Sequence, residues 1–218
     1  MVRTPKKAPS RSRAATKELR RQQLIDSTLD SIAKRGFSET TMANVADGAG
    51  LSRGIVNFHF HSKKALLEAT LQFLAEEYRA AWRRALDRAG TDPAERLQAL
   101  MMIDFDPVIC NRKKVAVWFA FFGEAKSRPT YMTLCATRDR EHWEAIGGLC
   151  REILAGGDYR GRNAETIASG LSAVADGLWL DMLVSPTTFD RDAARQVVDD
   201  YLTAVFPRHF PLDRRSVA

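Results

Sequence analysis

The stretch from Thr40 to Leu67 most constrains what this chain of 218 residues can fold into. Its sequence, TTMANVADGAGLSRGIVNFHFHSKKALL, contains two short helix patterns separated by a glycine and followed directly by a third. Thr40 or Thr41 can cap the first helix, because a hydroxyl oxygen accepts a hydrogen bond from a helix-opening amide. Gly50 then ends that helix, since glycine adopts a positive φ without a steric penalty.

The second short helix is predicted to begin at Arg53, after the capping residue Ser52. A helix of two turns is not stable alone in water, so it must pack on the first and leave its opposite face to solvent. Ser62 caps a third helix, which opens with Lys63 and Lys64 and so places ammonium groups beside unpaired amides. The pattern indicates a helix-turn-helix that binds DNA.

The residues from Gly36 to Ala69, GFSETTMANVADGAGLSRGIVNFHFHSKKALLEA, resemble the signature of the TetR family of transcriptional repressors. The shared features are the glycine–phenylalanine opening, the small-residue turn, the S-x-G start and the closing F-x-S-K-x-x-L. The resemblance implies an all-α fold, with an N-terminal three-helix helix-turn-helix domain and a C-terminal helical domain for ligand binding and dimerisation. Many family members carry tyrosine where this chain has Asn57, and often proline where it has His61, so contacts there need not follow the family.

Two groups of side chains in this predicted reader are expected to contact DNA. The residues expected to face bases are Arg53, Ile55, Asn57 and Phe58, next to Gly54 of the S-x-G start. The residues expected to hold phosphates are Thr41, Ser52, His59, Lys63 and Lys64. An ordinary helix pair with no DNA partner is the alternative, but several unrelated cap, turn and contact features would then coincide without a common cause.

The positive charge of the chain is concentrated at its N-terminus. Of the formal net charge of +6, residues 1–21 contribute +7, from eight lysines and arginines against Glu18. We expect residues 1–15 to form a basic, disordered arm that adds salt-dependent affinity for the minor groove or the backbone of DNA. The alternative is a solvated tail that only aids solubility.

The rest of the chain is predicted to be helical. Residues 16–62 form the helix-turn-helix domain, with a first helix to Arg35, and an uninterrupted pattern over 63–90 predicts one long connecting helix. Asp92 as a cap and Pro93 at the first helical position restart the chain in a ligand-binding and dimerisation domain, residues 91–218. Its expected helices lie at about 93–106, 110–126, 130–155, 163–184 and 190–205.

The helix expected at 163–184 is apolar on more than one side, so it needs two packing partners. Small residues on it would let another helix approach closely. With the last helix it predicts a two-fold contact between subunits, which would hold two reading helices about one DNA turn apart. The expected interface residues are Gly170, Val174, Gly177, Val197 and Tyr201. The alternative is that both apolar stripes belong to the core of one chain.

The blocks CNRKKVAVWFAFFGEAKSRPTYM and ADGLWLDMLVS, with the spacing between them, resemble the choline-responsive BetI-type repressors of the TetR family. This resemblance implies repression of genes for choline uptake and glycine betaine synthesis, relieved by choline. Choline is a permanent cation, so its site must offer aromatic faces and preferably a carboxylate. We expect the ligand to move the helices around residues 105–122, and through them the long connecting helix.

The expected ligand-binding residues are Phe105, Asp106, Trp118, Phe122, Tyr131, Trp143, Asp176 and Trp179. Other acids available in this domain are Asp104, Glu124, Glu144 and Asp181. Asp176 and Trp179 are the first choice for counter-charge and cage, because residues three apart are neighbours on a helix surface. Alternatively the aromatic residues form ordinary core, and a buried Asp176 bonds to a helix end or pairs with an arginine across the dimer.

Three other classes of protein are alternatives to a choline-responsive repressor. An efflux-gene repressor of the same family would use a similar pocket for bulky lipophilic cations. A constitutive architectural DNA-binding protein would show no dependence on small molecules. An enzyme would have to use one of three cysteines with His142, or His59 with His61 as metal ligands, although residues two apart on a helix face different ways.

No nucleophile elbow, phosphate loop or metal motif occurs in the sequence, so we expect neither enzymatic activity nor a cofactor nor a metal. Cys110, Cys135 and Cys150 lack the spacing of zinc ligands and are expected to be buried apolar residues, with a redox pair as the alternative. No uninterrupted apolar run approaches the ~20 residues that cross a bilayer. We therefore expect a cytoplasmic protein with no membrane partner.

Overall fold

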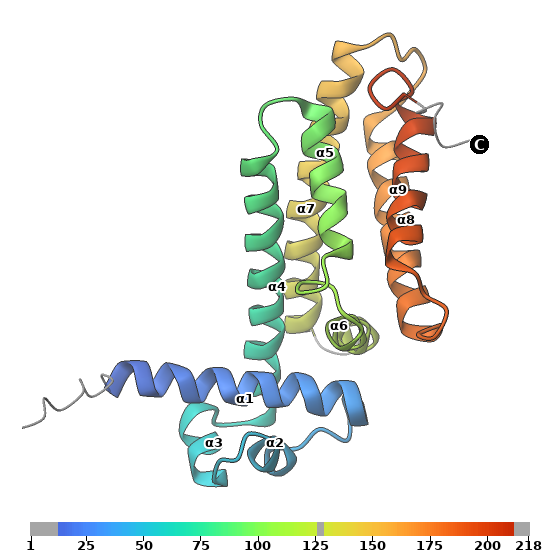
Figure 1. The fold of residues 1–218 in the computed structure, drawn as a ribbon. Coiled ribbons are helices and arrows are strands. Elements are labelled where there is room, and N and C mark those ends of the chain that lie inside the picture. The colour runs from blue at the N-terminus through green and yellow to red at the C-terminus, as the bar shows by residue number, and fades with distance from the viewer. Residues whose placement is uncertain (1–12, 126–128, 212–218) are drawn as a thin grey trace, which may run out of the picture. The chain divides into compact units, whose positions relative to one another are not determined.

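The computed structural model describes residues 13–125 and 129–211, and within these ranges every regular element is a helix, as the all-α prediction requires (Figure 1). The chain divides into two compact units, Met1–Thr70 and Leu71–Ala218. The division falls inside α4 (Lys63–Arg88), so the long connecting helix is not a separate domain. Its first two turns belong to the first unit and the remainder to the second.

The first unit contains α1 (Arg13–Arg35), α2 (Met42–Gly48) and α3 (Arg53–His59), with α2 in contact with both other helices. Its core combines the apolar faces of these helices: Leu24, Ile25, Leu29, Ile32, Val45, Ala46, Val56 and Phe60. Because α1 already begins at Arg13, the predicted arm is shorter than residues 1–15. The rest of that arm, residues 1–12, lies outside the described residues.

The caps that the sequence predicts define both short helices. The Thr41 hydroxyl accepts from the Asn44 amide at 3.2 Å, and the Asn44 side chain accepts from the Thr41 amide at 2.9 Å. These reciprocal bonds satisfy two amides that a helix start would otherwise leave unpaired. The Ser52 hydroxyl accepts from the amide of Ile55 in the same way, and Gly50 has a φ of 64°. The backbone therefore turns sharply where glycine alone carries no strain.

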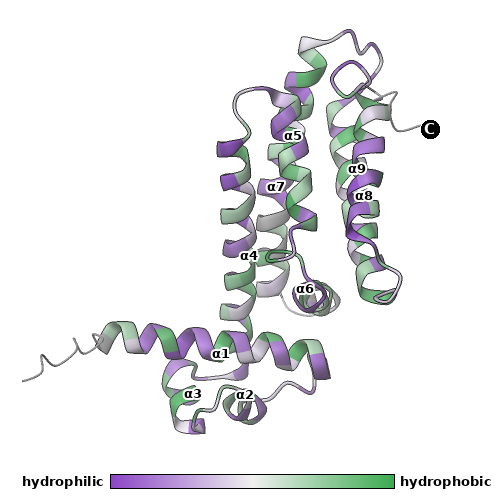
Figure 2. Cartoon of the chain, in the orientation of Figure 1, coloured by the Kyte–Doolittle hydropathy of each residue, from purple (hydrophilic) through white to green (hydrophobic). Residues whose placement is uncertain are grey.

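The second unit holds the remainder of α4 and the six elements after it. These are α5 (Pro93–Met102), the 3-10 turn η1 (Ile103–Phe105), α6 (Arg112–Ala125), α7 (Pro129–Gly156), α8 (Ala164–Val184) and α9 (Arg191–Val205). The helix α7 packs on α5, α6 and α8, and α8 packs on α6 and α9. Hydrophilic and hydrophobic residues alternate around most of these helices, as amphipathic packing requires (Figure 2). The predicted helix boundaries agree with the observed ones within a few residues.

Among the described residues, α8 is the helix that is long and apolar enough to cross a membrane by composition alone. It contains Glu165, Asp176 and Asp181, and it packs against α6, α7 and α9. A core helix of a helical domain meets the same criterion of length and composition. Packing on α6, α7 and α9 buries part of the apolar surface of α8, and the rest, which includes Leu180 and Val184, is exposed in a single chain.

Candidate functional site

The outer face of α3 carries the side chains predicted to read DNA bases. Arg53, Gly54 and Asn57 are exposed, and Phe58 is 67% exposed, although an aromatic ring of that size is normally buried. Val56 points the other way and is fully buried. The helix is thus held by one apolar side chain and presents a guanidinium, an amide and a ring to solvent. These groups suit base edges and thymine methyl groups in a major groove.

A shallow groove separates the N-terminal half of α1 from α3, and it is lined by Thr16, Lys17, Arg20, Ile55, Phe58 and His59. The Lys17 ammonium lies 5.7 Å from the centre of the Phe58 ring. Burial, followed by the charges of Lys17 and Arg21, lowers the pKa of His59 below its ordinary value. His59 is therefore neutral at pH 7, so it can meet a phosphate as a hydrogen-bond donor rather than as a cation.

The four predicted phosphate contacts outside α3 differ in what else they do. Thr41 and Ser52 are exposed, and each hydroxyl that accepts a capping bond still has a proton to donate. Lys64 is exposed and lies 3.8 Å from Glu68. The Lys63 ammonium instead donates to the carbonyls of Phe37 and Ser38, at 3.2 and 3.0 Å. The Lys63 ammonium has at most one N–H left for a phosphate. The sequence pattern does not indicate these carbonyl contacts.

We predict that Lys63→Ala lowers the free energy of unfolding by about 1–2 kcal/mol, because two carbonyls lose a charged donor. Urea denaturation of Lys63→Ala and Lys64→Ala measures this difference. The neighbouring substitution Lys64→Ala is expected to change stability by less than about 0.5 kcal/mol, since its ion pair is solvent-exposed. Equal stabilities of the two variants would show that the carbonyl contacts of Lys63 contribute nothing.

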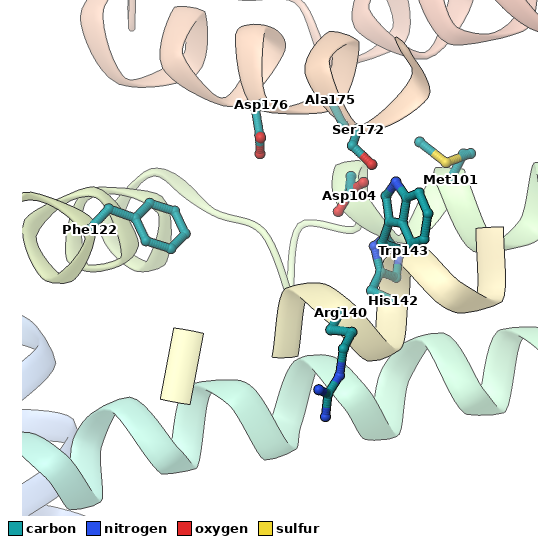
Figure 3. A pocket seen from close by; sticks show the side chains of 9 residues that line it. All are labelled: Met101, Asp104, Phe122, Arg140, His142, Trp143, Ser172, Ala175 and Asp176. Atoms are coloured by element: carbon teal, nitrogen blue, oxygen red, sulfur yellow. The ribbon is translucent and has the colours of Figure 1, made fainter. Parts of the chain in front are cut away.

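The second unit contains a cavity of about 430 Å³ between η1, α5, α6, α7 and α8 (Figure 3). Its walls carry aromatic rings, two carboxylates and an imidazole; the lining residues are Met101, Asp104, Phe122, Arg140, His142, Trp143, Ser172, Ala175 and Asp176. Figure 3 shows the Arg140 side chain turned away from the others, and its guanidinium lies 3.8 Å from Glu144 on the same helix. The cavity chemistry therefore favours a positively charged guest with apolar surface.

The predicted ligand residues separate into two groups. The structure brings Phe122, Trp143 and Asp176 together at the cavity. The others lie behind the wall or away from it: Phe105, Asp106, Trp118, Tyr131 and Trp179. Trp118 stacks on Phe122 with ring centres 6.0 Å apart, and so supports the wall from behind.

Two expectations about these acids and rings are corrected by the structure. In a single chain Asp176 is exposed and Trp179 is buried. Asp176 lines the cavity and Trp179 does not, so the two residues do not form the expected pair of counter-charge and aromatic cage. Trp179 uses its indole N–H to bond the carbonyl of Asp104 at 3.0 Å. Asp106 accepts from the amides of Val108 and Ile109 and so forms the turn before α6.

Sequence reasoning missed several cavity residues. Asp104 is only one of several available acids in the sequence, although a carboxylate within the apolar run Met-Met-Ile-Asp-Phe is a signal that could have singled it out. The sequence suggests His142 only as a partner for a catalytic cysteine in the enzyme alternative. The remaining lining residues, Met101, Arg140, Ser172 and Ala175, carry no sequence signal of their own.

The predicted interface residues also lie in two settings. Gly170 faces Tyr201 within the same chain, and a Cβ at Gly170 would clash with the tyrosine oxygen. A side chain at this position would require the Tyr201 ring to move. Val174 is half-buried, while Gly177 and Val197 are exposed. An exposed stripe runs along α8 at helical spacing through Ala173, Gly177, Leu180 and Val184, and we call it the α8 stripe.

The cysteines within the described part of the chain behave as core residues. Cys110 and Cys150 are buried, and burial raises the pKa of Cys150 to about 12. Its thiol is therefore protonated at neutral pH and a poor nucleophile. The side chain of Cys135 lies outside the described residues. No cluster of three or more metal-ligating side chains occurs in the described ranges.

An exposed reading helix in one unit and a chemically distinctive cavity in the other define a ligand-responsive helix-turn-helix regulator. Residues 24–70 match the family of bacterial regulatory proteins named tetR, and residues 93–207 match the C-terminal domain of BetI-type transcriptional repressors. The chain belongs to the TetR family and has a BetI-type C-terminal domain. Members of this family bind operator DNA and a small-molecule effector; they are not enzymes, so the enzyme alternative is rejected.

Relatives and solved structures agree with this assignment. The chain is 37% identical to the HTH-type transcriptional regulator BetI of Burkholderia thailandensis over 85% of this chain and 93% of the relative. It is 36% identical to the BetI regulator of Paraburkholderia phymatum over 85% and 92% of the two chains.

Among solved structures, the fold is similar to a protein of Pseudomonas aeruginosa PAO1 described as a transcriptional regulator, with a TM-score of 0.77, 26% identity and coverage of 88% and 93%. A regulator of Saccharomonospora viridis, solved in complex with choline, has a TM-score of 0.73, 25% identity and coverage of 85% and 96%. These matches give an efflux repressor no better support than the BetI-type assignment.

Proposed function

We propose that this protein represses genes for choline uptake and glycine betaine synthesis, binds its operator as a homodimer in the cytoplasm, and is released by choline. The observation that carries the proposal is the cavity in the BetI-type domain, which combines aromatic rings with two carboxylates. The choline complex of the Saccharomonospora viridis regulator, similar to this chain over 85% of its length, supports the same ligand.

The chemistry of the cavity suits a trimethylammonium group. Trp143 and Phe122 offer ring faces from α7 and α6, and each cation–π contact contributes about 0.5–2 kcal/mol depending on its desolvation. Asp104 and Asp176 add negative charge from η1 and α8. Ser172 can bond the alcohol of choline. Glycine betaine should bind poorly, because its carboxylate would enter a cavity that already holds two.

The cavity walls are tied to α4, whose first turns belong to the DNA-reading unit. Lys114 on α6 pairs with Glu77 on α4 at 2.5 Å, and Glu141 on α7 pairs with Arg79 on α4 at 2.6 Å. A ligand that moves α6 or α7 therefore acts on α4. Release requires that choline bind better to the form with misplaced reading helices, by the roughly 1–3 kcal/mol typical of such couplings.

The proposal is tested by measuring operator affinity with and without choline, by fluorescence anisotropy on operator DNA selected from a random pool. We expect saturating choline to weaken operator binding by about 5–150-fold, which corresponds to that coupling range. Glycine betaine at the same concentration should leave the operator affinity within about 3-fold of its value without ligand. A ligand that binds so weakly should change the free energy of operator binding by less than about 1 kcal/mol. An affinity that responds to large cationic dyes but not to choline would instead favour an efflux repressor.

We further predict that Phe122→Leu weakens choline binding by about 3–30-fold, because the cavity then has one ring face fewer. Isothermal titration calorimetry measures the change. Phe119→Leu is the matched control, since Phe119 is half-buried on the same helix and touches the Phe122 ring edge-on at 6.1 Å without lining the cavity. Equal effects of the two substitutions would place the choline site elsewhere.

A further inference from the structure

One wall of the cavity is formed by a buried carboxylate that is held in a fixed orientation. Asp104 is only 3% exposed and lies on η1. The hydroxyl of Tyr78, on α4, donates to Asp104 Oδ1 at 2.6 Å, a length typical of a bond to an ionised carboxylate. The Asp104 carbonyl accepts from the Trp179 indole at 3.0 Å. Side chain and backbone are thus both anchored while the residue lines the cavity.

The same hydroxyl connects Asp104 to a histidine on the cavity wall. His142 Nε2 lies 3.2 Å from the Tyr78 oxygen, and the two rings meet edge-on with centres 5.2 Å apart. A tyrosine hydroxyl has a single proton, which here goes to Asp104, so His142 Nε2 must carry a proton and donate to Tyr78. With the ring neutral, a directed chain runs from His142 through Tyr78 to Asp104, across α7, α4 and η1.

We propose that Asp104 is the counter-charge that selects a cationic effector, and that His142 must be neutral for the cation to bind. The inference rests on the proposed function and names the residues that make it work. A carboxylate away from water attracts a cation more strongly than an exposed one, whose charge is screened. Asp104 therefore outweighs Asp176, which lies on the same cavity but is exposed.

The charges around His142 determine whether the affinity for the effector rises or falls with pH. Among the side chains that the structure describes, the titratable and charged groups that face or flank His142 are Tyr78, Arg79 and Arg83 on α4, Asp104 on η1, Asp176 on α8, and Arg140, Glu141 and Glu144 on α7. Glu141 pairs with Arg79 and Glu144 lies by Arg140, so Asp104 and Asp176 are the acids among the described residues that line the cavity. Protonated His142 would add a positive charge to this wall and compete with the effector for Asp104.

The affinity for a cation should fall in acid. Bound effector disfavours the imidazolium form, so affinity is greatest while the His142 ring is neutral and falls as the ring takes up a proton. One proton linked to one cation gives a slope approaching tenfold in affinity per pH unit. The effector therefore dissociates in acid. The charge of a quaternary amine does not change with pH, so this dependence must come from the protein.

The experiment is calorimetric titration of the full-length protein with choline and with tetramethylammonium, at pH values from 8.0 to 5.5. The variants are Asp104→Asn, Asp176→Asn and His142→Gln. Asparagine keeps an oxygen to accept from Tyr78, and glutamine keeps a donor near the position of Nε2. His209→Gln is the matched control, because His209 also bonds a tyrosine, Tyr159 at 2.8 Å, but lies outside the cavity. Thermal unfolding of each variant confirms that it is folded.

We expect Asp104→Asn to weaken binding of both cations at pH 8.0 at least 10-fold and Asp176→Asn less than 3-fold. Binding to the unaltered protein and to His209→Gln should weaken as the pH falls to 5.5, while His142→Gln should show little pH dependence. Choline binding that is independent of pH, or a larger loss for Asp176→Asn than for Asp104→Asn, overturns the inference and leaves the proposed function intact. An unaltered protein that binds neither cation at any pH overturns both.

Discussion

Replacing Leu180 and Val184 together by glutamate should convert the proposed dimer to a monomer and reduce operator affinity at least about 100-fold, since one subunit then loses the second half-site. These side chains are 46% and 66% exposed in a single chain, at the end of the α8 stripe. Ala173 and Gly177 on the same stripe are small enough to let a second helix approach closely. The exposed side chains of Leu180 and Val184 would give that helix apolar surface to pack on. A carboxylate at either position would be buried without a partner in such an interface.

Analytical ultracentrifugation measures the oligomeric state, and anisotropy on operator DNA measures the affinity. Val108→Glu is the matched control, because Val108 is 67% exposed on the loop before α6 and away from the α8 stripe. This control should remain dimeric and keep its operator affinity within about 2-fold, as surface substitutions usually do. A double variant that still sediments as a dimer would place the subunit contact on another surface.

The fold could be predicted from the sequence because its signals are local. Thr41, Gly50 and Ser52 mark helix boundaries through bonds and dihedral angles that involve neighbours only a few residues away. Asp92 and Pro93 do the same for α5, where the aspartate accepts from the amide of Ala94. Such features require no knowledge of tertiary packing, and they agree with one another along the whole chain.

The cavity could be predicted only in part, because its walls come from five elements. Helical spacing identifies which side chains share a face, but it does not say which face meets a cavity. In the sequence, Asp176 three residues away favours Trp179 over Trp143 as the aromatic ligand residue. In the structure Trp179 is buried in the core, where it donates to the Asp104 carbonyl. Asp104 itself lies on η1, where the 3-10 winding departs from the periodicity of α5 and changes the direction of the side chain.

The reader shows a similar division between local and tertiary information. Exposure of Arg53 and Asn57 follows from the amphipathic pattern of α3, in which Val56 alone is fully buried. The role of Lys63 does not follow, because its partners Phe37 and Ser38 are more than twenty residues away in the chain. A cluster of lysines in a sequence therefore overstates the number of cations that can reach phosphates.

Arg53→Ala should remove most of the sequence specificity of DNA binding. The guanidinium is exposed at the first position of α3, where a recognition helix contacts base edges. A bidentate contact to a guanine contributes about 1–3 kcal/mol, and a dimer makes the contact twice, so operator binding should weaken by about 2–6 kcal/mol. Binding to unrelated DNA should weaken far less, because it depends on phosphate contacts.

Anisotropy titrations on operator and scrambled DNA, each at several salt concentrations, separate the two kinds of contact. Lys64→Ala is the matched comparison, since Lys64 is also exposed and cationic but is assigned to a phosphate. It should weaken binding to both DNAs alike and reduce the salt slope by about one unit for each phosphate that the protein no longer neutralises. If Arg53→Ala produced equal losses on both DNAs and the same change in slope, Arg53 would be a phosphate contact, and specificity would have to come from the amide of Asn57 and the ring of Phe58.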